Sequence, residues 1–260
     1  MVSEVLNDLA GGKISVAQAE KRLKLLAITE LQGTARIDTG REFRKGIPEI
    51  VIAEGKTVED LRQIVSAVLK ENGQVIVSRL SPPQYNSIRS TLRRAGTAYY
   101  RARAKILVVK KKGSLKRTRG GSVGILTAGT SDIPVAEEAK VIAEEMGCKV
   151  FSAYDVGVAG LHRLFNPLRK MIDQEIDVLI VVAGREGALP TVVAGLMDIP
   201  VIAVPTSMGY GFGDRGHSAL AAMLQACSLG LAVVNIDAGV AAGALAALIA
   251  RRAARGRKGL

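Results

Sequence analysis

From residue 122 onward the chain alternates short apolar runs with segments of helical periodicity, and this pattern restricts the fold more than any other feature. Apolar runs that contain β-branched residues and lack a helical period predict buried strands. The predicted strands are 123–126, 149–153, 178–183, 201–204 and 231–234, and the predicted helices are 133–146, 164–174, 189–197, 215–228 and 240–253. Such alternation implies a parallel sheet covered on both faces, so we expect a three-layer α/β sandwich.

The earlier part of the chain predicts a helical N-terminus and a second, smaller α/β domain. Two short helices, 3–10 and 15–27, come first, and Ser15 with Gln18 forms a capping box for the second. Further strands are expected at 35–38, 49–53, 75–78, 97–100 and 105–109, with helices at 57–71 and after Ser81. The predicted organisation is a helical segment (1–30), a small α/β domain (31–109), a basic linker (110–121) and the larger α/β domain (122–260).

The net charge of +12 is concentrated in two stretches. Of the 36 basic residues, eleven lie in 110–120 and 251–258, which leaves 25 basic residues against 24 acidic ones elsewhere. No aromatic residues interleave with these basic residues, as a platform for stacking single-stranded bases would require. Nucleic acid is therefore not an expected partner.

The sequence also argues against a membrane or secreted location. No apolar run reaches the roughly 18 residues needed to cross a bilayer. The N-terminus carries acids and lacks a basic region followed by an apolar core, so it does not read as a signal peptide. The two cysteines form no disulfide framework or metal-binding pattern. We expect a cytoplasmic protein.

The loop after the first strand of the larger domain has the composition of a phosphate site. Residues 127–131 are small and rich in hydroxyls, and Asp132 is a candidate N-cap for the helix that follows. Free backbone N–H groups, hydroxyls and a helix N-terminus aimed at one point suit a phosphate. The alternative is an ordinary turn in which Ser131 and Asp132 only cap the helix.

Polar residues follow four consecutive strands, at the edge where parallel sheets bind ligands. Candidate substrate-binding residues are Thr130, Ser131 and Asp132 after the first strand, Asp155, His162 and Arg163 after the second, Gly184 and Arg185 after the third, and Ser207, Met208 and Gly209 after the fourth. The two arginines would pair with phosphates or carboxylates. Asp155 would orient Arg163 or accept a ribose hydroxyl, and His162 would contact a diphosphate or make a structural hydrogen bond.

Several of these strings resemble a known family. GTSDIPVAEEA, LHR, AGREGALPTVVAGL, DIPVIAVP and NIDAGVAAGALAA resemble, in this order, motifs of the aminoimidazole ribonucleotide carboxylase fold (the PurE type). The resemblance implies a flavodoxin-like, PurE-like sheet, a nucleotide phosphate on the first Ser–Asp loop and an octamer. That family's catalytic His lies two residues before the Pro of the third loop, where this chain has Ala188.

A second resemblance covers residues 37–250. YDVGVAGLHRL, VAGREGALPTVVAGL, VPTSMGYG and GREFRKGIPEIVIAEGKT are similar to the family that starts synthesis of the nickel-pincer nucleotide of lactate racemase (the LarB type). It implies carboxylation of nicotinic acid adenine dinucleotide with CO2 or bicarbonate, and hydrolysis that releases AMP and pyridinium-3,5-biscarboxylic acid mononucleotide. No tightly bound cofactor is expected. Because the sequence shows no metal triad, any Mg²⁺ would be held by the substrate diphosphate and one carboxylate.

This chemistry needs a thiolate and a base. Cys227 corresponds to the nucleophile of the LarB-type family, and Glu186 is the candidate acid or base. Cys148 precedes a strand, away from the ligand edge, which favours a structural role. The alternatives are that Cys227 belongs to a buried apolar helix face and that Glu186 caps a helix N-terminus.

The sequence leaves two alternative functions open and also predicts a homo-oligomer. The alternative functions are an aminoimidazole ribonucleotide carboxylase or mutase of purine synthesis and a non-catalytic nucleotide-binding module. Residues 238–250 are rich in Ala and Gly, and this smooth helix face predicts close packing between subunits of a homo-oligomer.

Overall fold

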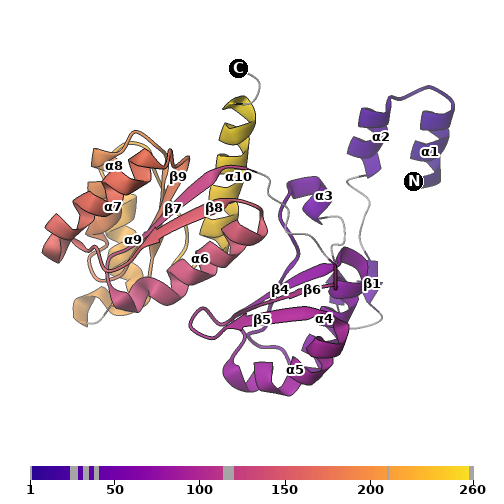
Figure 1. The fold of residues 1–260 in the computed structure, drawn as a ribbon, viewed down its shortest axis with the longest axis horizontal. Coiled ribbons are helices and arrows are strands. Elements are labelled where there is room, and N and C mark those ends of the chain that lie inside the picture. Colours follow the sequence, from indigo (N-terminus) through magenta and orange to yellow (C-terminus); the bar gives the residue numbers. More distant parts are fainter. Residues whose placement is uncertain are drawn as a thin grey trace. The chain divides into compact units, whose positions relative to one another are not determined.

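The structure, a computed structural model, describes residues 2–23, 29–31, 35–37, 41–113, 120–209 and 211–257 (Figure 1). The predicted helix end at Ala27, the predicted strand end at Asp38, linker residues 114–119 and the tail residue Lys258 lie outside the described residues. The chain divides into two compact units, Met1–Tyr100 with Leu107–Ser114, and Arg101–Ile106 with Leu115–Leu260.

The N-terminal unit begins with two helices and a small two-stranded sheet. Helices α1 (Val2–Ala10) and α2 (Val16–Leu23) come first, and Ser15 and Gln18 form the predicted capping box through bonds of 2.8 and 3.2 Å. Strands β1 (Thr29–Leu31) and β2 (Ala35–Ile37) pair antiparallel. The sequence did not predict β1, which begins inside the segment 1–30 expected to be helical.

A four-stranded sheet and two amphipathic helices form the core of this unit (Figure 1). The strand order is β3-β4-β6-β5, with β3 (Ile50–Ile52), β4 (Gln74–Ser78), β5 (Thr97–Arg101) and β6 (Ile106–Lys110). Helices α4 (Val58–Asn72) and α5 (Pro82–Ala95) pack on the sheet, and the short helix α3 is Arg41–Lys45. Thr57 caps α4, and Gly73 ends it with φ 72°, because glycine adopts this left-handed conformation without strain.

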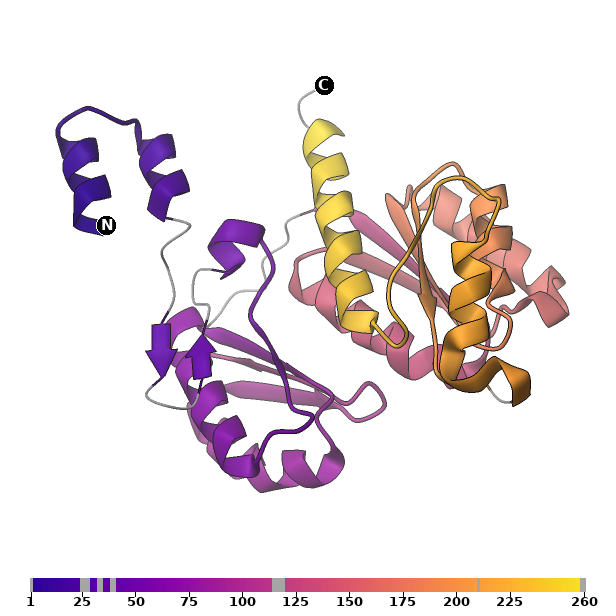
Figure 2. The ribbon, with the colours of Figure 1, turned by 180° about the vertical axis from the view of Figure 1, so that it is seen from behind.

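The C-terminal unit has the predicted three-layer α/β architecture (Figure 2). Its strands β7 (Ser122–Thr127), β8 (Lys149–Ala153), β9 (Val178–Ala183), β10 (Val201–Pro205) and β11 (Leu231–Val233) form an all-parallel sheet in the order β11-β10-β9-β7-β8. Helices α7 (His162–Asp173), α8 (Ala188–Leu196) and α9 (His217–Leu224) cover one face, and α6 (Ile133–Glu145) and α10 (Gly239–Arg257) pack together on the other. The fold prediction is confirmed.

The Ala- and Gly-rich face of α10 packs within its own chain. A Cβ on Gly239 would lie 2.4 Å from the carbonyl oxygen of Val135, and one on Gly243 would lie 2.4 Å from that of Ala139. Both glycines are therefore needed for the close approach of α10 to α6. This finding corrects the prediction that the same face packs between subunits, because it is already buried against α6.

Residues 215–228 differ most from their prediction as one continuous helix. A 3₁₀ segment, η3 (Gly211–Gly216), turns at Gly216 with φ 89°, and α9 then ends at Leu224. Cys227 consequently lies in the loop before β11 and is exposed. The alternative that Cys227 belongs to a buried apolar helix face is wrong, since Leu224 is also 65% exposed. Across the described residues, no helix has the length and apolarity that a bilayer crossing requires.

Candidate active site

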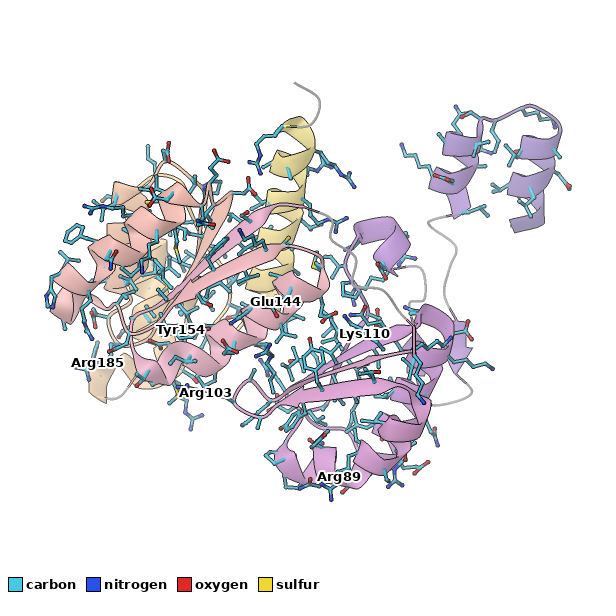
Figure 3. All side chains as sticks on the ribbon, in the orientation of Figure 1. Arg89, Arg103, Lys110, Glu144, Tyr154 and Arg185 are labelled. Atoms are coloured by element: carbon cyan, nitrogen blue, oxygen red, sulfur yellow. The ribbon has the colours of Figure 1, made fainter. Side chains whose placement is uncertain are left out.

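A hollow of about 330 Å³ lies at the carboxyl ends of the parallel strands. Its walls come from the loops after β7, β8, β9 and β10, as the strand-end argument predicts. The lining residues are Ala128, Gly129, Ser131, Asp132, Asp155, Gly157, Val158, Ala159, Arg163, Ala183, Gly184, Arg185, Glu186, Ala188, Leu189 and Met208. Arg185, at this edge, is labelled in Figure 3. We call this hollow the strand-end pocket.

Eight of the candidate residues line the strand-end pocket, and five do not. Ser131, Asp132, Asp155, Arg163, Gly184, Arg185, Glu186 and Met208 belong to its wall. Thr130, His162, Ser207, Gly209 and Cys227 lie outside it. Thr130 is exposed in a 3₁₀ turn beside the wall, and His162 is the exposed first residue of α7. A Cβ on Gly209 would lie 3.8 Å from the backbone nitrogen of Arg185, so Gly209 adjoins the wall.

The buried side chain of Asp132 stabilises the first loop through two hydrogen bonds. Its side chain is 3% exposed, its Oδ2 accepts a bond of 2.8 Å from the Gly129 N–H, and its Oδ1 accepts one of 2.7 Å from the Thr206 hydroxyl. Its side chain makes no N-cap hydrogen bond to α6. The capping role predicted for Asp132 is therefore replaced by a link between the loops after β7 and β10.

Burial raises the pKa of Asp132. The hydrogen bonds from Thr206, Gly129 and Gly184 act in the opposite direction, and the nearby carboxylate of Asp237 adds to the rise. A buried carboxylate is tolerated when donors surround it, and here each donor comes from the scaffold. Asp132 thus holds the shape of the first loop, while the hydroxyl of Ser131 stays exposed at the pocket wall.

The second loop joins a strained aspartate to an arginine. Asp155 has φ 59°, and its N–H donates to the hydroxyl of Thr127 at 3.0 Å. Its carboxylate accepts a bond of 2.6 Å from Arg163, the second residue of α7. A Cβ on Gly157 would lie 2.6 Å from the carbonyl oxygen of Ala128, so only glycine lets this loop rest on the first one. The guanidinium of Arg163 is held at the pocket wall by this arrangement.

The third loop presents two charged side chains between glycines. A Cβ on Gly184 would lie 2.7 Å from the Thr206 hydroxyl, and one on Gly187, which has φ 66°, would lie 2.7 Å from the carbonyl oxygen of Ala219. Between them Arg185 has φ 50°, and both Arg185 and Glu186 are exposed. The close packing of the two glycines fixes the loop, so the charged pair projects from a rigid turn.

A fifth strand end also contributes, which the sequence analysis did not predict. After β11, Asp237 takes φ 55° and its carboxylate accepts a bond of 2.9 Å from the Ser207 N–H. Its own N–H donates to the carbonyl of Pro205 at 2.9 Å. These two hydrogen bonds of Asp237, together with the buried Thr206, hold the fourth loop in place. The signal was the Asp–Ala–Gly sequence at 237–239, separated by two residues from the predicted strand 231–234.

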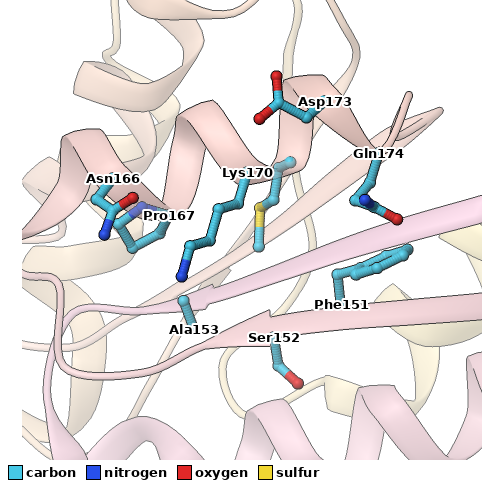
Figure 4. A pocket seen from close by; sticks show the side chains of 9 residues that line it. Phe151, Ser152, Ala153, Asn166, Pro167, Lys170, Asp173 and Gln174 are labelled. Atoms are coloured by element: carbon cyan, nitrogen blue, oxygen red, sulfur yellow. The ribbon is translucent and has the colours of Figure 1, made fainter.

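A larger hollow, of about 460 Å³, lies between α7 and the edge strand β8 (Figure 4). Side chains of α7, among them Asn166 and Lys170, face Phe151 and Ala153 of the edge strand β8. None of the predicted site residues lines it. The strand-end pocket is smaller, but eight of the predicted site residues line it, and we take it as the candidate active site.

The two cysteines have opposite surroundings. Cys148 is 7% exposed, its thiol lies 3.9 Å from the carbonyl of Ala247, and burial raises its pKa to about 11. This placement fits the structural role expected of it. Cys227 is exposed, outside the pocket wall. The single chain thus does not bring Cys227 and Glu186 together in the pocket.

Tyr154 is another titratable group near the second loop, and it is labelled in Figure 3. Its hydroxyl donates to the carboxylate of Glu137 on α6. Burial, followed by this carboxylate, raises the pKa of Tyr154 to about 12. The phenol therefore stays protonated, and it serves to tie the second loop to α6. Among the described residues, no group of three or more His, Cys, Asp or Glu side chains is arranged to hold a metal ion.

These features define a two-unit α/β protein whose candidate ligand pocket lies at the carboxyl edge of a parallel sheet. Residues 28–112 match the model of the LarB/PurE-like N-terminal domain, and residues 122–257 match that of AIR carboxylase. The chain belongs to the PurE-like AIR carboxylase family and has the LarB-type architecture, with a LarB/PurE-like domain preceding the carboxylase domain.

Individual relatives agree with this assignment. A protein of Methanocaldococcus jannaschii described as uncharacterized is 42% identical over 252 residues, covering 95% of this chain and 96% of the relative. The N5-carboxyaminoimidazole ribonucleotide mutase of the same organism is 33% identical over 123 residues, covering 47% of this chain and 74% of the mutase. The mutase of Mycobacterium leprae is 30% identical over 136 residues, covering 51% and 76%. The family is that of carboxylase- and mutase-type enzymes.

Proposed function

We propose that this protein carboxylates the pyridinium ring of nicotinic acid adenine dinucleotide and cleaves its phosphoanhydride. The products would be pyridinium-3,5-biscarboxylic acid mononucleotide and AMP, the first step of nickel-pincer nucleotide synthesis for lactate racemase maturation. The observation that carries the proposal is the third loop, where Glu186 lies at the pocket wall and Ala188 occupies the position of the PurE-type catalytic His. The LarB/PurE-like domain over residues 28–112 supports the same choice.

The pocket wall offers groups for an anionic nucleotide. The hydroxyl of Ser131 and the small residues of the first loop leave room for a phosphate near the start of α6. Arg163, oriented by Asp155, and Arg185 supply planar guanidinium groups for the second phosphate or the carboxylate of the ring. Because Asp132 is committed to Gly129 and Thr206, it contributes by holding the loop rather than by contacting the ligand.

The ring chemistry can be written with the residues of this chain. The thiolate of Cys227 adds to C4 of the pyridinium, which converts the ring into a dihydropyridine. C5 of that ring is an enamine carbon, and it forms a C–C bond to CO2. Glu186 accepts the proton from C5, the C4–S bond breaks, and the ring regains its aromaticity with the thiolate released. The cycle consumes CO2, releases one proton and needs no oxidant.

Hydrolysis requires water to attack one phosphorus of the diphosphate, with AMP as one product. Any Mg²⁺ would be held by the substrate diphosphate and one carboxylate of the pocket, and it would stabilise charge on the phosphate oxygens. Such an ion would arrive with the substrate.

A second candidate function is N5-carboxyaminoimidazole ribonucleotide mutase or carboxylase activity, which the printed names of several relatives favour. It is weaker because the third loop has Ala188 where that chemistry needs a proton-transferring His. Binding of a nucleotide without turnover is a third outcome.

Incubation of the purified protein with nicotinic acid adenine dinucleotide and bicarbonate separates these functions. We expect AMP release, together with a mononucleotide whose mass has increased by one carboxyl group, detected by liquid chromatography and mass spectrometry. Turnover of aminoimidazole ribonucleotide, or binding of the dinucleotide without products, would overturn the proposal. Cys227→Ala should abolish ring carboxylation while Cys148→Ala retains it, and a fully active Cys227→Ala would exclude the thiolate step.

A further inference from the structure

The strand-end pocket has room for one half of a dinucleotide. Its volume of about 330 Å³ is near the lower end of the roughly 300–1,000 Å³ that pockets for drug-sized ligands occupy. A dinucleotide consists of two nucleosides joined by a diphosphate, and is larger than such ligands. Under the proposed function the pyridinium ring must meet Glu186 inside this pocket. The adenosine half of the substrate therefore has to lie beyond the wall.

Two large apolar side chains are available to a base at the rim of the pocket. Among the described residues that line the wall, none is aromatic, so a base has no ring to stack on inside the pocket. Met208 lines the pocket and is 55% exposed, and Phe212, four residues later, is 103% exposed. An aromatic face is the surface on which a nucleic acid base stacks most readily.

Backbone contacts place Phe212 beside the pocket wall. A Cβ on Gly213 would lie 3.7 Å from the carbonyl oxygen of Arg185. One on Gly209 would lie 3.8 Å from the backbone nitrogen of Arg185 and 3.5 Å from the carbonyl oxygen of Gly213. The two glycines thus pack on each other and on Arg185, which lines the wall. Phe212 directly precedes Gly213, so its side chain begins one residue from this contact.

The chain is anchored to the end of β10 both before Met208 and after Phe212. Before Met208, the Ser207 N–H donates to the carboxylate of Asp237 at 2.9 Å. After Phe212, Gly216 is buried, and a Cβ there would lie 2.7 Å from the carbonyl oxygen of Thr206. The fully exposed ring of Phe212 buries no apolar area in this chain, so packing does not account for an aromatic residue here.

We propose that Phe212 and Met208 form the subsite for the adenine base of the dinucleotide, with the ring of Phe212 stacked on the base. This inference rests on the proposed function, which supplies a substrate with an adenine half. A diphosphate held by Arg163 and Arg185 leads outward from the reacting ring, and Arg185 is the wall residue that Gly209 and Gly213 touch. Phe212 is then a specificity-determining residue that favours the dinucleotide over a mononucleotide.

Binding of the two substrate halves tests the inference by isothermal titration calorimetry, without any turnover. Phe212→Ala should weaken the binding of AMP by about 5- to 100-fold, because it removes the stacking surface. Phe212→Tyr keeps an aromatic ring and should bind AMP within about threefold of wild type. Nicotinic acid mononucleotide, which has the pyridinium ring but no adenine, should bind equally to wild type and Phe212→Ala.

The matched control is Phe165→Ala. Phe165 lies on α7, is 52% exposed and lines neither hollow, so its loss should change the affinity for neither half. In the carboxylation assay, Phe212→Ala should raise the KM for the dinucleotide by the factor found for AMP and leave kcat within about twofold of wild type. A lower kcat with an unchanged KM would place Phe212 in the chemistry and overturn the inference.

The remaining outcomes separate this inference from the proposed function. Equal AMP affinity in wild type and Phe212→Ala, or no binding of millimolar AMP by wild type, would overturn the inference even if the protein carboxylates the dinucleotide. Phe212-dependent AMP binding by a protein that does not carboxylate the dinucleotide would overturn only the proposed function.

Two further results would reject the stacking of adenine on Phe212. One is a Phe212→Tyr protein as weak in AMP binding as Phe212→Ala, or a Phe212→Ala protein that loses the mononucleotide as well. The other is a change in the mass of Phe212→Ala in light scattering, which would assign Phe212 to a contact between copies of the chain.

Discussion

The carboxyl edge of the five-stranded sheet holds Asp155, Arg185 and Asp237 in the left-handed backbone region, whereas the amino edge mainly uses glycines such as Gly121 and Gly147 where the chain turns that way. A non-glycine residue in this region costs about 1 kcal/mol or more. At the amino edge, glycines let the backbone turn with little strain. At the carboxyl edge, charged residues adopt the same strained conformation. Strain of this kind is expected where a side chain must point at a ligand.

The charged groups of the two edges differ in the same way. At the amino edge Asp177 is buried, accepts a bond of 2.6 Å from the Ser122 N–H, and pairs with Arg257 of α10. At the carboxyl edge Glu186 and Arg185 are exposed. Substitutions at the amino edge should therefore change stability, and substitutions at the carboxyl edge should change activity.

The largest expected effect is the loss of activity in Glu186→Gln. Removing the base should lower the rate of carboxylation by about 10²–10⁴-fold, because an amide cannot accept the C5 proton. The free energy of unfolding should stay within about 0.5 kcal/mol of wild type, since the side chain is exposed. Glu175→Gln, an exposed glutamate before β9, is the control and should change neither quantity. Equal carboxylation rates for the two variants would contradict the assignment of activity to the carboxyl edge.

The next effect is on stability at the amino edge. Asp177→Ala removes the acceptor of the partly buried Ser122 N–H and should lower the free energy of unfolding by about 1–3 kcal/mol. Urea denaturation followed by circular dichroism measures this change. Asp198→Ala, at an exposed aspartate before β10, should lie within about 0.5 kcal/mol of wild type. If Asp177→Ala instead lowered the turnover of the folded protein, the amino edge would have a functional role.

The pH dependence of stability should report the buried thiol. The pKa of Cys148 is raised to about 11, so the folded state retains the proton that the unfolded chain loses near pH 9. The stabilisation by the protonated thiol is complete below pH 9 and is lost as the pH rises toward 11, on the order of 2 kcal/mol. Cys148→Ala should unfold with a flatter dependence over this range than the wild type. Identical slopes in the two proteins would contradict the burial of Cys148.

The smallest effect is expected from Arg163→Lys. The pair that Arg163 forms with Asp155 is half exposed, so its loss should change stability by less than about 1 kcal/mol. A lysine cannot reproduce the planar fork, and the KM for the dinucleotide should rise several-fold. Arg169→Lys on the exposed side of the same helix is the control. A stability loss without a change in KM would assign Arg163 to the scaffold.

The sequence predicted most elements of both units, because those elements have a local signal. Apolar runs marked the strands of the parallel sheet, and the predicted helix starts at Thr57 and Ser81 are where the structure has N-caps. The strand β1 was missed because three residues at the end of a predicted helical segment give no periodicity. Of the pocket, the polar residues of four loops could be predicted from their position after strands.

The remaining features depend on contacts that sequence patterns do not encode. The hydrogen bond between Thr206 and Asp132 joins residues 74 positions apart. Because of it, Asp132 links the loops after β7 and β10, although the sequence predicted it as the N-cap of a helix. The position of Cys227 follows from the early end of α9 at Leu224, which depends on how residues 225–230 lead into β11 beside β10. The helical periodicity of apolar residues continues through this loop, so the sequence analysis predicted a helix that ends at residue 228.

The glycine contacts between α6 and α10 have a consequence for how the C-terminal unit folds. Gly239 and Gly243 meet Val135 and Ala139, in each case 104 positions earlier in the chain. Contacts of such long range form late, because the intervening chain must first be ordered. Until α10 docks, α6 exposes the surface around Val135 and Ala139 that the two glycines cover in the folded unit. We therefore expect slow folding of this unit and a folding intermediate whose exposed groove on α6 is prone to aggregation.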